Sequence, residues 1–272
     1  MKIRSIIVAS VLLAIAAIGL YAFQQPPTVS ILPAIPSTVY VNNTTTVTIN
    51  AQITDSRVIP NGVNVLQIDP LTGSQTVIGT LNGSGQTFTI TIRPNTATPQ
   101  LLTYQVSAAF QGLLKRSLSL PITVAVAPSG VVLPPDPGPA GMITLAGIDS
   151  DGDGVRDDVQ RWIAVTYPNS AKIRAALTQE ARATQQMVLS SATESQALAA
   201  SNNELDAGEC TMGLLGTDPG YELGTRLRAT ILNTADRTRA YLTADALTSG
   251  SSYRPASEPL SLCQFNPNAL PN

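Results

Sequence analysis

Alternating polar and apolar residues dominate the chain from about Thr28 to Val126. Thr46–Ile53 and Thr87–Ile92 each place their apolar side chains on one face, and this period of two predicts β-strands. Further strands are expected at Val63–Ile68, Thr76–Leu81, Leu102–Phe110 and Ser117–Val126. Turn signals separate them at Pro60-Asn61-Gly62, Asp69-Pro70-Leu71-Thr72-Gly73 and Asn82-Gly83-Ser84-Gly85. The pattern predicts an antiparallel β-sandwich over residues 26–126.

The pattern changes after a proline-rich segment. Ala127–Ala140 contains five prolines, so we expect a semi-rigid linker over residues 127–147. The following residues, 148–272, are rich in Ala, Gln, Arg and Leu, and helices are expected at Asp157–Thr166, Ser170–Ala200 and Tyr221–Leu247. Ser170 suits the N-cap of the second helix. The expected fold class is therefore multidomain, with a β-domain followed by a mainly α-helical domain.

The β-rich region resembles the immunoglobulin-like or fibronectin type III-like modules of surface proteins, because about seven short strands alternate with turns. The resemblance is one of pattern, since no Cys-Trp-Cys set is present and the single tryptophan, Trp162, lies in the second half. The resemblance implies a spacer or binding module. Its few aromatic residues do not indicate a sugar-stacking platform.

Residues 1–25 have the character of an export signal. Lys2 and Arg4 precede an apolar run from Ile6 to Phe23. Two outcomes are compatible with a run of this length: removal as a signal peptide, or retention as a transmembrane anchor through residues 6–23. In both cases the basic start predicts that the rest of the chain lies outside the cytoplasm, in the periplasm, on the cell surface or secreted.

The chain contains two cysteines, Cys210 and Cys263, and no histidine. In an exported protein an even cysteine count favours a disulfide bond between them. The absence of histidine excludes Ser-His-Asp and Cys-His catalysis and histidine-liganded zinc. With 16 basic and 18 acidic residues, the chain has no excess positive charge to hold a nucleic acid.

One motif carries specific chemistry. Five of the 18 acidic residues fall between Asp149 and Asp158. Carboxylates at the first, third and fifth positions of a loop can point inward around a cation, with a glycine turn at the sixth position and a backbone carbonyl at the seventh. Oxygen ligands without nitrogen or sulfur select Ca²⁺ over transition metals. The expected ligands are Asp149, Asp151, Asp153, Val155, Asp157 and Gln160.

This stretch resembles the calcium loops of EF-hand, dockerin and thrombospondin type 3 sequences. The resemblance implies that Asp149, Asp151 and Asp153 bind through their side chains, Val155 through its carbonyl, and Asp157 directly or through water. The twelfth position departs from the family, because Gln160 stands where these loops have Glu or Asp. Either Gln160 supplies a single carbonyl oxygen or Asp158 takes its place.

These features predict an exported, calcium-binding, non-enzymatic protein with a structural or binding role. Its partner is expected to be an unknown protein or a surface polysaccharide. The alternative is an extracytoplasmic hydrolase or carbohydrate-binding adhesin that uses undetermined carboxylates. The acids available for catalysis in the helical region are Glu180, Glu194, Glu204, Asp206 and Glu209.

Overall fold

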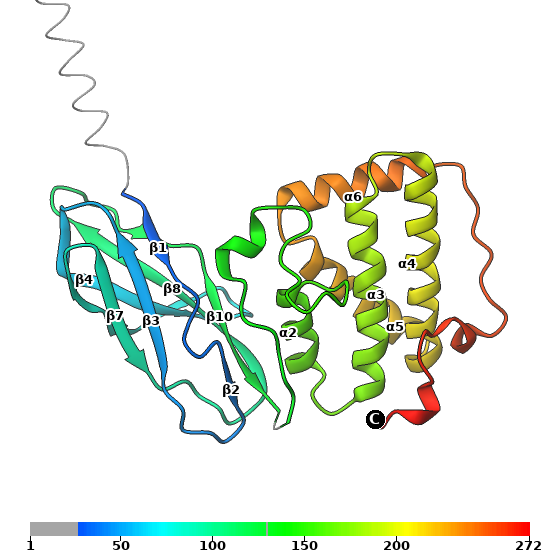
Figure 1. Cartoon of the computed structure of the whole chain (residues 1–272), viewed down its shortest axis with the longest axis horizontal. Helices are drawn as coiled ribbons and strands as arrows, with labels where there is room; N and C mark the ends of the chain where they lie inside the picture. The colour runs from blue at the N-terminus through cyan, green and yellow to red at the C-terminus, as the bar shows by residue number, and fades with distance from the viewer. Residues whose placement is uncertain (1–26, 129) are drawn as a thin grey trace, which may run out of the picture. The chain divides into compact units, whose positions relative to one another are not determined.

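The computed structural model describes residues 27–128 and 130–272, so the proposed leader over residues 1–25 lies outside the described residues. Strands occupy the first half of the described chain and helices the second half (Figure 1). The protein is therefore a mixed β and α chain, as the pattern of apolar residues predicts. The ten strands are β1 (Val29–Ile31), β2 (Thr38–Tyr40), β3 (Val47–Ile53), β4 (Val58–Ile68), β5 (Gln75–Thr80), β6 (Asn82–Ser84), β7 (Thr87–Ile92), β8 (Gln100–Phe110), β9 (Ser117–Leu118) and β10 (Ile122–Ala127).

The strands form two sheets. One has the order β1-β3-β7-β6, and the other has the order β2-β10-β8-β4-β5, with β9 paired to β8. Most pairs are antiparallel, whereas β2 and β10 run parallel. Alternate residues of β3 are buried, which is the consequence of the period of two in its sequence.

Of the three expected turns, one is wrong, one is partly confirmed and one is confirmed. Pro60-Asn61-Gly62 lies inside β4, before the stretch from Asn64 that pairs with β5. Asn82-Gly83-Ser84 forms β6, and Gly85, with φ of +70°, lies in the turn that follows and pairs β6 with β7. At Pro60-Asn61-Gly62, local turn propensity is overridden by the place of β4 in the sheet. The third turn is confirmed, because the Asp69 side chain accepts hydrogen bonds from the backbone amides of Leu71 and Thr72 between β4 and β5.

Five α-helices follow the strands. They are α2 (Asp157–Thr166), α3 (Ala171–Leu189), α4 (Glu194–Leu215), α5 (Thr217–Ile231) and α6 (Ala235–Leu247). Three short 3₁₀ helices accompany them at Gly138–Met142, Pro259–Leu262 and Pro267–Ala269. The expected helix over residues 157–166 is confirmed, and Ser170 caps α3 by accepting a hydrogen bond from the amide of Ile173.

The other two expected helices are each divided in two. The break within residues 170–200 precedes Thr193, whose side chain accepts a hydrogen bond from the amide of Gln196 and caps α4. The break within residues 221–247 precedes Thr234, which caps α6 through the amide of Arg237. Hydroxyl side chains favour a cap over a helix interior, so these threonines start new helices where apolar periodicity alone predicts continuation.

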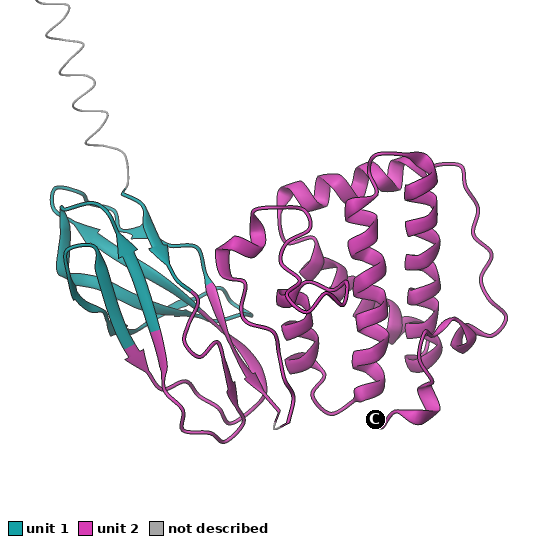
Figure 2. Cartoon of the chain, viewed as in Figure 1, with its two compact units in different colours: residues 1–32, 49–90, 104–121 teal, residues 33–48, 91–103, 122–272 magenta. Residues whose placement is uncertain are grey.

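The chain divides into two compact units (Figure 2). Among the described residues, the first contains residues 27–32, 49–90 and 104–121, and the second contains residues 33–48, 91–103 and those from 122 onward. The second unit thus includes β2, β10 and helices α2 to α6. Within the described residues, no helix has the length and apolar character needed to cross a membrane.

The proline-rich segment makes specific contacts within the second unit. Asp136 is buried, and its carboxylate accepts hydrogen bonds from the backbone amides of Thr123 and Gly138. Pro134 contributes its carbonyl to the guanidinium of Arg161, which reaches it from α2. The segment is therefore held by hydrogen bonds at more than one point along its length.

The helical core is built from aliphatic side chains of four helices and of the loop before α2. Its buried members include Val155, Ile163, Leu177, Leu227 and Ala240. Val155 belongs to the acidic loop, so the apolar core and the candidate ligand set share a residue. Any displacement of that loop would remove an aliphatic side chain from the core.

Three arginine side chains, Arg156, Arg161 and Arg237, are almost completely buried. The guanidinium of Arg237 donates to the carbonyls of Gly141, Thr144 and Leu145 and to the side-chain oxygen of Asn233. Buried charged groups are tolerated when each donor has a partner. Arg237 therefore binds the chain segment before the acidic loop to the start of α6.

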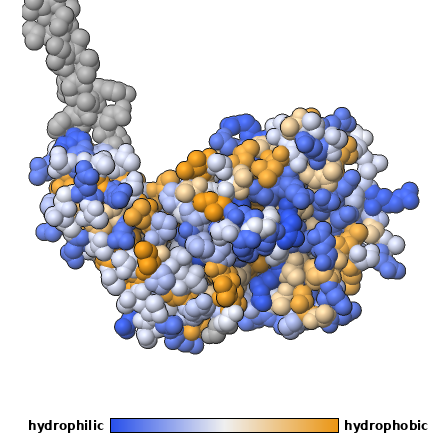
Figure 3. All heavy atoms as spheres, in the orientation of Figure 1, coloured by the Kyte–Doolittle hydropathy of each residue, from blue (hydrophilic) through white to orange (hydrophobic). Residues whose placement is uncertain are grey.

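Exposed apolar side chains are dispersed over the described residues, with Leu71, Leu114 and Val132 among the most exposed. On the face drawn in Figure 3, hydrophobic residues form separate patches among hydrophilic ones. Scattered apolar residues of this kind are ordinary on protein surfaces.

Cys210 of α4 and Cys263 are joined by a disulfide bond with an S–S distance of 2.02 Å, as the even cysteine count predicts. The bond ties the C-terminal segment to the helices, and the carbonyl of Leu262 and the amide of Gln264 also hydrogen-bond to the side chain of Gln179. The segment after α6 is thus anchored by a covalent bond and by a buried amide on α3.

We predict that replacing both cysteines with alanine lowers the free energy of unfolding by about 4 kcal/mol, because the bridge closes a long loop in the unfolded chain. Guanidinium unfolding of the oxidised wild type and of the double variant measures the difference. Reduced wild type should resemble the variant. Equal midpoints for the oxidised wild type and the variant would contradict the prediction.

We also predict that Arg237→Met lowers the free energy of unfolding by about 3 kcal/mol or more, because it leaves buried carbonyls without donors. The matched control is Arg239→Met on the same helix. The Arg239 side chain is 73% exposed and forms a surface ion pair with Asp236, so its loss should change stability by about 0.5 kcal/mol or less. Urea unfolding of both variants tests the contrast, and equal losses would refute it.

Candidate metal centre

The acidic loop, defined here as Asp149–Gln160, closes onto the first turn of α2. The backbone amide of Asp157 donates to the carbonyl of Ile148 at 2.9 Å, which brings the two ends of the loop together. The amide of Ser150 donates to the Asp157 carboxylate at 2.8 Å. These two bonds hold the start of the loop against Asp157, the first residue of α2.

The first carboxylate of the loop organises the backbone. Asp149 accepts a hydrogen bond from the amide of Gly152 on one oxygen and from the amide of Gly154 on the other, at 2.8 and 2.9 Å. Gly154 has φ of +86°, a conformation that side chains with a Cβ rarely adopt. The loop therefore curls around Asp149.

Three carboxylates converge at the centre of the loop. Asp149, Asp151 and Asp153 each place an oxygen within 4.8 Å of the other two. Calcium binds oxygen at about 2.4 Å, so two ligands of one ion lie at most about 4.8 Å apart. The spacing of the three oxygens is thus compatible with a shared cation.

Gln160 lies against two of these carboxylates. Its Nε2 donates to Asp151 at 3.0 Å and to Asp153 at 3.2 Å, so the positive end of the amide dipole sits between the two negative groups. The hydrogen bond from Gln160 is the main cause that lowers the pKa of Asp151. The amide therefore offsets part of the repulsion within the loop.

The oxygen of the same amide accepts no hydrogen bond from the described residues. Oε1 of Gln160 is buried and has no hydrogen-bond partner among the described residues. A buried carbonyl oxygen without a donor is costly. Rotation of the amide by half a turn exchanges its two ends, so the side chain has an acceptor to offer a cation at the twelfth position of the loop.

The remaining two acids have different surroundings. Asp157 is 1% exposed, and burial raises the pKa of its carboxyl. The hydrogen bond from the amide of Ser150 lowers this pKa and so offsets part of the effect of burial. Asp158 is engaged outside the loop, because it forms an ion pair with Arg156 at 2.8 Å and accepts a hydrogen bond from Asn233. Of the two candidates for the twelfth ligand, the structure thus places Gln160 with the carboxylates and Asp158 with an arginine.

Two further residues bind the loop to the helices. Arg182 of α3 donates from Nε to the carbonyl of Asp153 at 2.8 Å, and its side chain packs against Gly154, where a Cβ would lie 3.1 Å from the same nitrogen. Arg156 donates to the carbonyl of Ile231 at the end of α5. The sequence does not single out these arginines, because their partners are backbone carbonyls far along the chain.

The acids considered for catalysis do not form one group. Glu180, Glu204 and Glu209 line a single cavity of about 390 Å³ among the helices. Glu194 is exposed at the start of α4, and Asp206 accepts a hydrogen bond from the hydroxyl of Tyr253. Sequence spacing alone cannot reveal this grouping, since Glu180 lies on α3 and the other two on α4.

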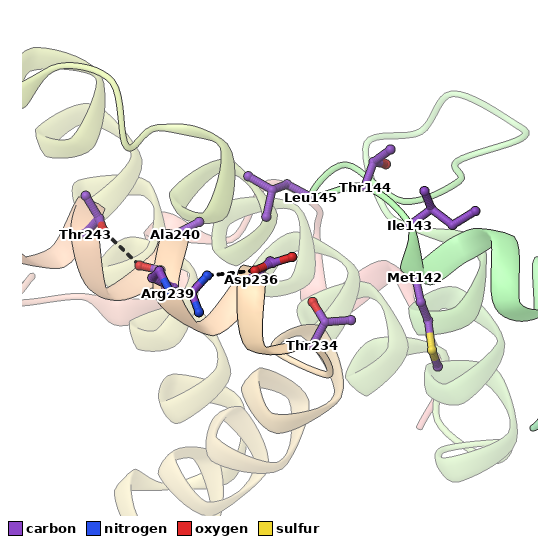
Figure 4. Close-up of a pocket in the computed structure, with 9 residues that line it drawn as sticks. All are labelled: Met142, Ile143, Thr144, Leu145, Thr234, Asp236, Arg239, Ala240 and Thr243. Carbon is purple, nitrogen blue, oxygen red and sulfur yellow. Dashed lines mark hydrogen bonds and ion pairs between the residues drawn. The ribbon is translucent and has the colours of Figure 1, made fainter. Parts of the chain in front are cut away.

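A second hollow of about 350 Å³ lies between Met142–Leu145 and the first turns of α6 (Figure 4). Its charged side chains, Asp236 and Arg239, already pair with each other at 2.7 Å. Thr243 uses its hydroxyl to donate to the carbonyl of Arg239. The polar groups of this hollow are therefore satisfied within the helix, and they offer little for recognition of a ligand.

No family model matches the chain, and a search of curated proteins finds no significant match.

Proposed function

We propose that the chain is an exported protein whose acidic loop binds one Ca²⁺ ion, and that the ion stabilises the junction between the proline-rich segment and the helices. The observation that carries this proposal is the convergence of three carboxylate oxygens within 4.8 Å beside a buried amide oxygen without a donor. A spacer or binding role for the β-rich region completes the proposal.

The chemistry of the donor set supports calcium. The expected ligands are the carboxylates of Asp149, Asp151 and Asp153, the carbonyl of Val155 and the amide oxygen of Gln160, with Asp157 binding directly or through water. All are hard oxygen donors, and a flexible set of six or more suits Ca²⁺ better than the strict octahedron of Mg²⁺. Outside the cell, dissociation constants of about 0.1 to 1 mM suffice to fill such a loop.

The contacts of the loop explain how an ion would act on the helices. Val155 carries a candidate ligand on its backbone while its side chain is buried in the helical core. Gln160 belongs to α2, and Asp153 receives a hydrogen bond from Arg182 of α3. An ion that fixes these backbone and side-chain positions binds the native state alone and so raises its stability.

We further propose that the β-rich region is an immunoglobulin-like sandwich. The strand order β1-β3-β7-β6 corresponds to strands A, B, E and D of that fold, and β10-β8-β4-β5 corresponds to G, F, C and C′. This correspondence supports the resemblance that alternation in the sequence indicates. Modules of this kind present loops at their ends for binding, which agrees with a protein or surface polysaccharide as partner.

Export is proposed from the basic and apolar start of the sequence, and the disulfide between Cys210 and Cys263 supports it. Stable disulfides form in oxidising compartments outside the cytoplasm. Both readings of the leader, cleaved signal peptide or retained anchor, place the acidic loop where free calcium is abundant.

We predict that calcium raises the melting temperature of the wild-type chain and that Asp151→Ala abolishes the rise. At a calcium concentration one hundred times the dissociation constant, the stabilisation amounts to about 2.7 kcal/mol. Thermal unfolding in excess calcium and in chelator, together with calorimetric titration, measures it. Magnesium at the same concentration should have a smaller effect.

Asp158→Asn is the matched control for that experiment. Because Asp158 pairs with Arg156 rather than with the loop carboxylates, its replacement should lower stability in both calcium and chelator but preserve the difference between them. A wild-type melting temperature that is identical in calcium and chelator, with no heat of binding at millimolar calcium, would refute the proposed function.

We predict opposite effects of Gln160→Glu with and without calcium. In chelator, glutamate would lose two hydrogen bonds to Asp151 and Asp153 and add a like charge, so stability should fall by about 1 kcal/mol or more. In calcium, the added carboxylate should tighten binding roughly tenfold, which corresponds to about 1.4 kcal/mol.

The control for this variant is Gln186→Glu, which adds the same charge at an exposed position of α3. It should leave the calcium affinity unchanged. A Gln160→Glu variant that is more stable than wild type in chelator, or that binds calcium no more tightly, would show that Gln160 does not lie at the ion.

A further inference from the structure

The cavity among α3, α4, α5 and α6 combines acidic and aromatic side chains. Its volume of about 390 Å³ falls within the range of small-molecule sites. Four acids line it, namely Glu180, Glu204, Glu209 and Asp245, against a single base, Arg228. Three tyrosines also line it, namely Tyr221, Tyr241 and Tyr253. A wall of this composition attracts positive charge and offers aromatic faces.

Glu204 is already fully engaged. One of its oxygens accepts from the hydroxyl of Thr184 at 2.8 Å and from Arg228 at 3.3 Å, and the other accepts from the hydroxyl of Tyr241 at 2.9 Å. Arg228 also lies 5.8 Å from the centre of the Tyr241 ring. This carboxylate therefore holds the helices together and has little capacity left for a ligand.

Glu209 is also committed, because one of its oxygens accepts a hydrogen bond from the backbone amide of Ala256 at 2.8 Å. Through this bond it fixes the segment after α6, which contributes Tyr253 and Pro255 to the wall of the cavity. Two of the four acids, Glu204 and Glu209, are thus committed to holding the wall of the cavity together. The arrangement favours binding over hydrolysis by paired carboxylates.

Glu180 differs from both. It is 4% exposed, and its Oε2 accepts from the hydroxyl of Thr211 at 2.8 Å. Its Oε1 receives no hydrogen bond from any described residue, although the side chain lines the cavity. Burial raises the pKa of this carboxyl, and the hydrogen bond from Thr211 and the charge of Arg228 offset only part of that effect.

A glycine makes room for this oxygen. A Cβ at Gly224 of α5 would overlap Oε1 of Glu180, so only glycine permits the carboxylate to occupy this place. Gly224 is in helical conformation, where alanine would otherwise be preferred by about 1 kcal/mol. The helix thus accepts a weak helix former at the one position that accommodates the unpaired carboxylate.

From this geometry we infer that the cavity binds a small organic cation, a primary or secondary ammonium group on an apolar body. The ammonium donates a hydrogen bond to Oε1 of Glu180 and contacts the tyrosine faces, as cations do over aromatic rings. The volume is larger than a bare ammonium ion needs, and Met212 and Leu205 provide apolar surface for the carbon skeleton. The inference is independent of the calcium loop.

The full chain without its leader is titrated with 2-phenylethylamine hydrochloride by calorimetry, and 2-phenylethanol is the neutral isostere. We expect saturable binding of the amine and at least tenfold weaker binding of the alcohol. Glu180→Gln should weaken amine binding at least tenfold, whereas Glu194→Gln, which removes an exposed acid on α4, should not change it.

Two further variants keep the test decisive if Glu180→Gln unfolds. Tyr221→Ala removes a ring that is 69% exposed at the cavity and should weaken amine binding several-fold without unfolding the chain. Gly224→Ala should displace the Glu180 carboxylate and thereby also weaken amine binding. Equal affinity of wild type for amine and alcohol, or no binding of either at millimolar concentration, would overturn the inference.

Discussion

The burial of arginine side chains is the constraint on which the second unit depends. A guanidinium carries five N–H donors, and each one removed from water needs an acceptor. Arg156 and Arg237 obtain most of theirs from backbone carbonyls and from Asn233. Arg156 reaches from the acidic loop to the last residue of α5 and to Gln185 of α3, and Arg237 reaches from α6 to residues 141–145, so the arginines fix residues 141–156 against α3, α5 and α6. Aliphatic packing alone does not specify the path of a segment without regular structure.

The acidic loop benefits from this arrangement. Its start is held against α2 by the hydrogen bond between Ile148 and Asp157, its middle by Arg182, and Val155 by the core. Three carboxylates can therefore remain close together without forcing the loop open. The amide of Gln160 reduces their repulsion, which is the electrostatic role that a bound cation would perform more strongly. A loop prepared in this way loses little conformational entropy when it binds an ion.

The need of a buried polar group for a hydrogen-bond partner also distinguishes the acids of the helical cavity. Glu204 has partners for both oxygens and acts as a link between α3, α4, α5 and α6 through Thr184, Arg228 and Tyr241. Glu180 has one donor, Thr211, and lines a cavity, while its other oxygen receives no hydrogen bond from the described residues. Two glutamates that look alike in the sequence thus differ in what they can do. Satisfied groups stabilise a fold, whereas a buried group without a partner indicates a place for a ligand.

The sequence by itself determined the features that depend on neighbouring residues. Alternation predicted the central stretches of most strands, and the run of aspartates and glycines placed the loop immediately before α2. The turn expected at Pro60-Asn61-Gly62 and the unbroken helix expected over residues 170–200 were wrong, because pairing of β4 and capping by Thr193 decided those positions. Apolar periodicity alone does not show where strand pairing or a helix cap will override it.

Only the tertiary structure decided which polar residues are buried and what they bind. Arg237 and Arg239 are two residues apart on α6, yet one is enclosed by carbonyls of residues 141–145 and the other is exposed. The grouping of Glu180, Glu204 and Glu209 likewise depends on how α3 packs against α4. Hydrogen bonds between residues 30 to 100 positions apart leave no periodic trace in a sequence, because either partner alone looks like an ordinary surface residue.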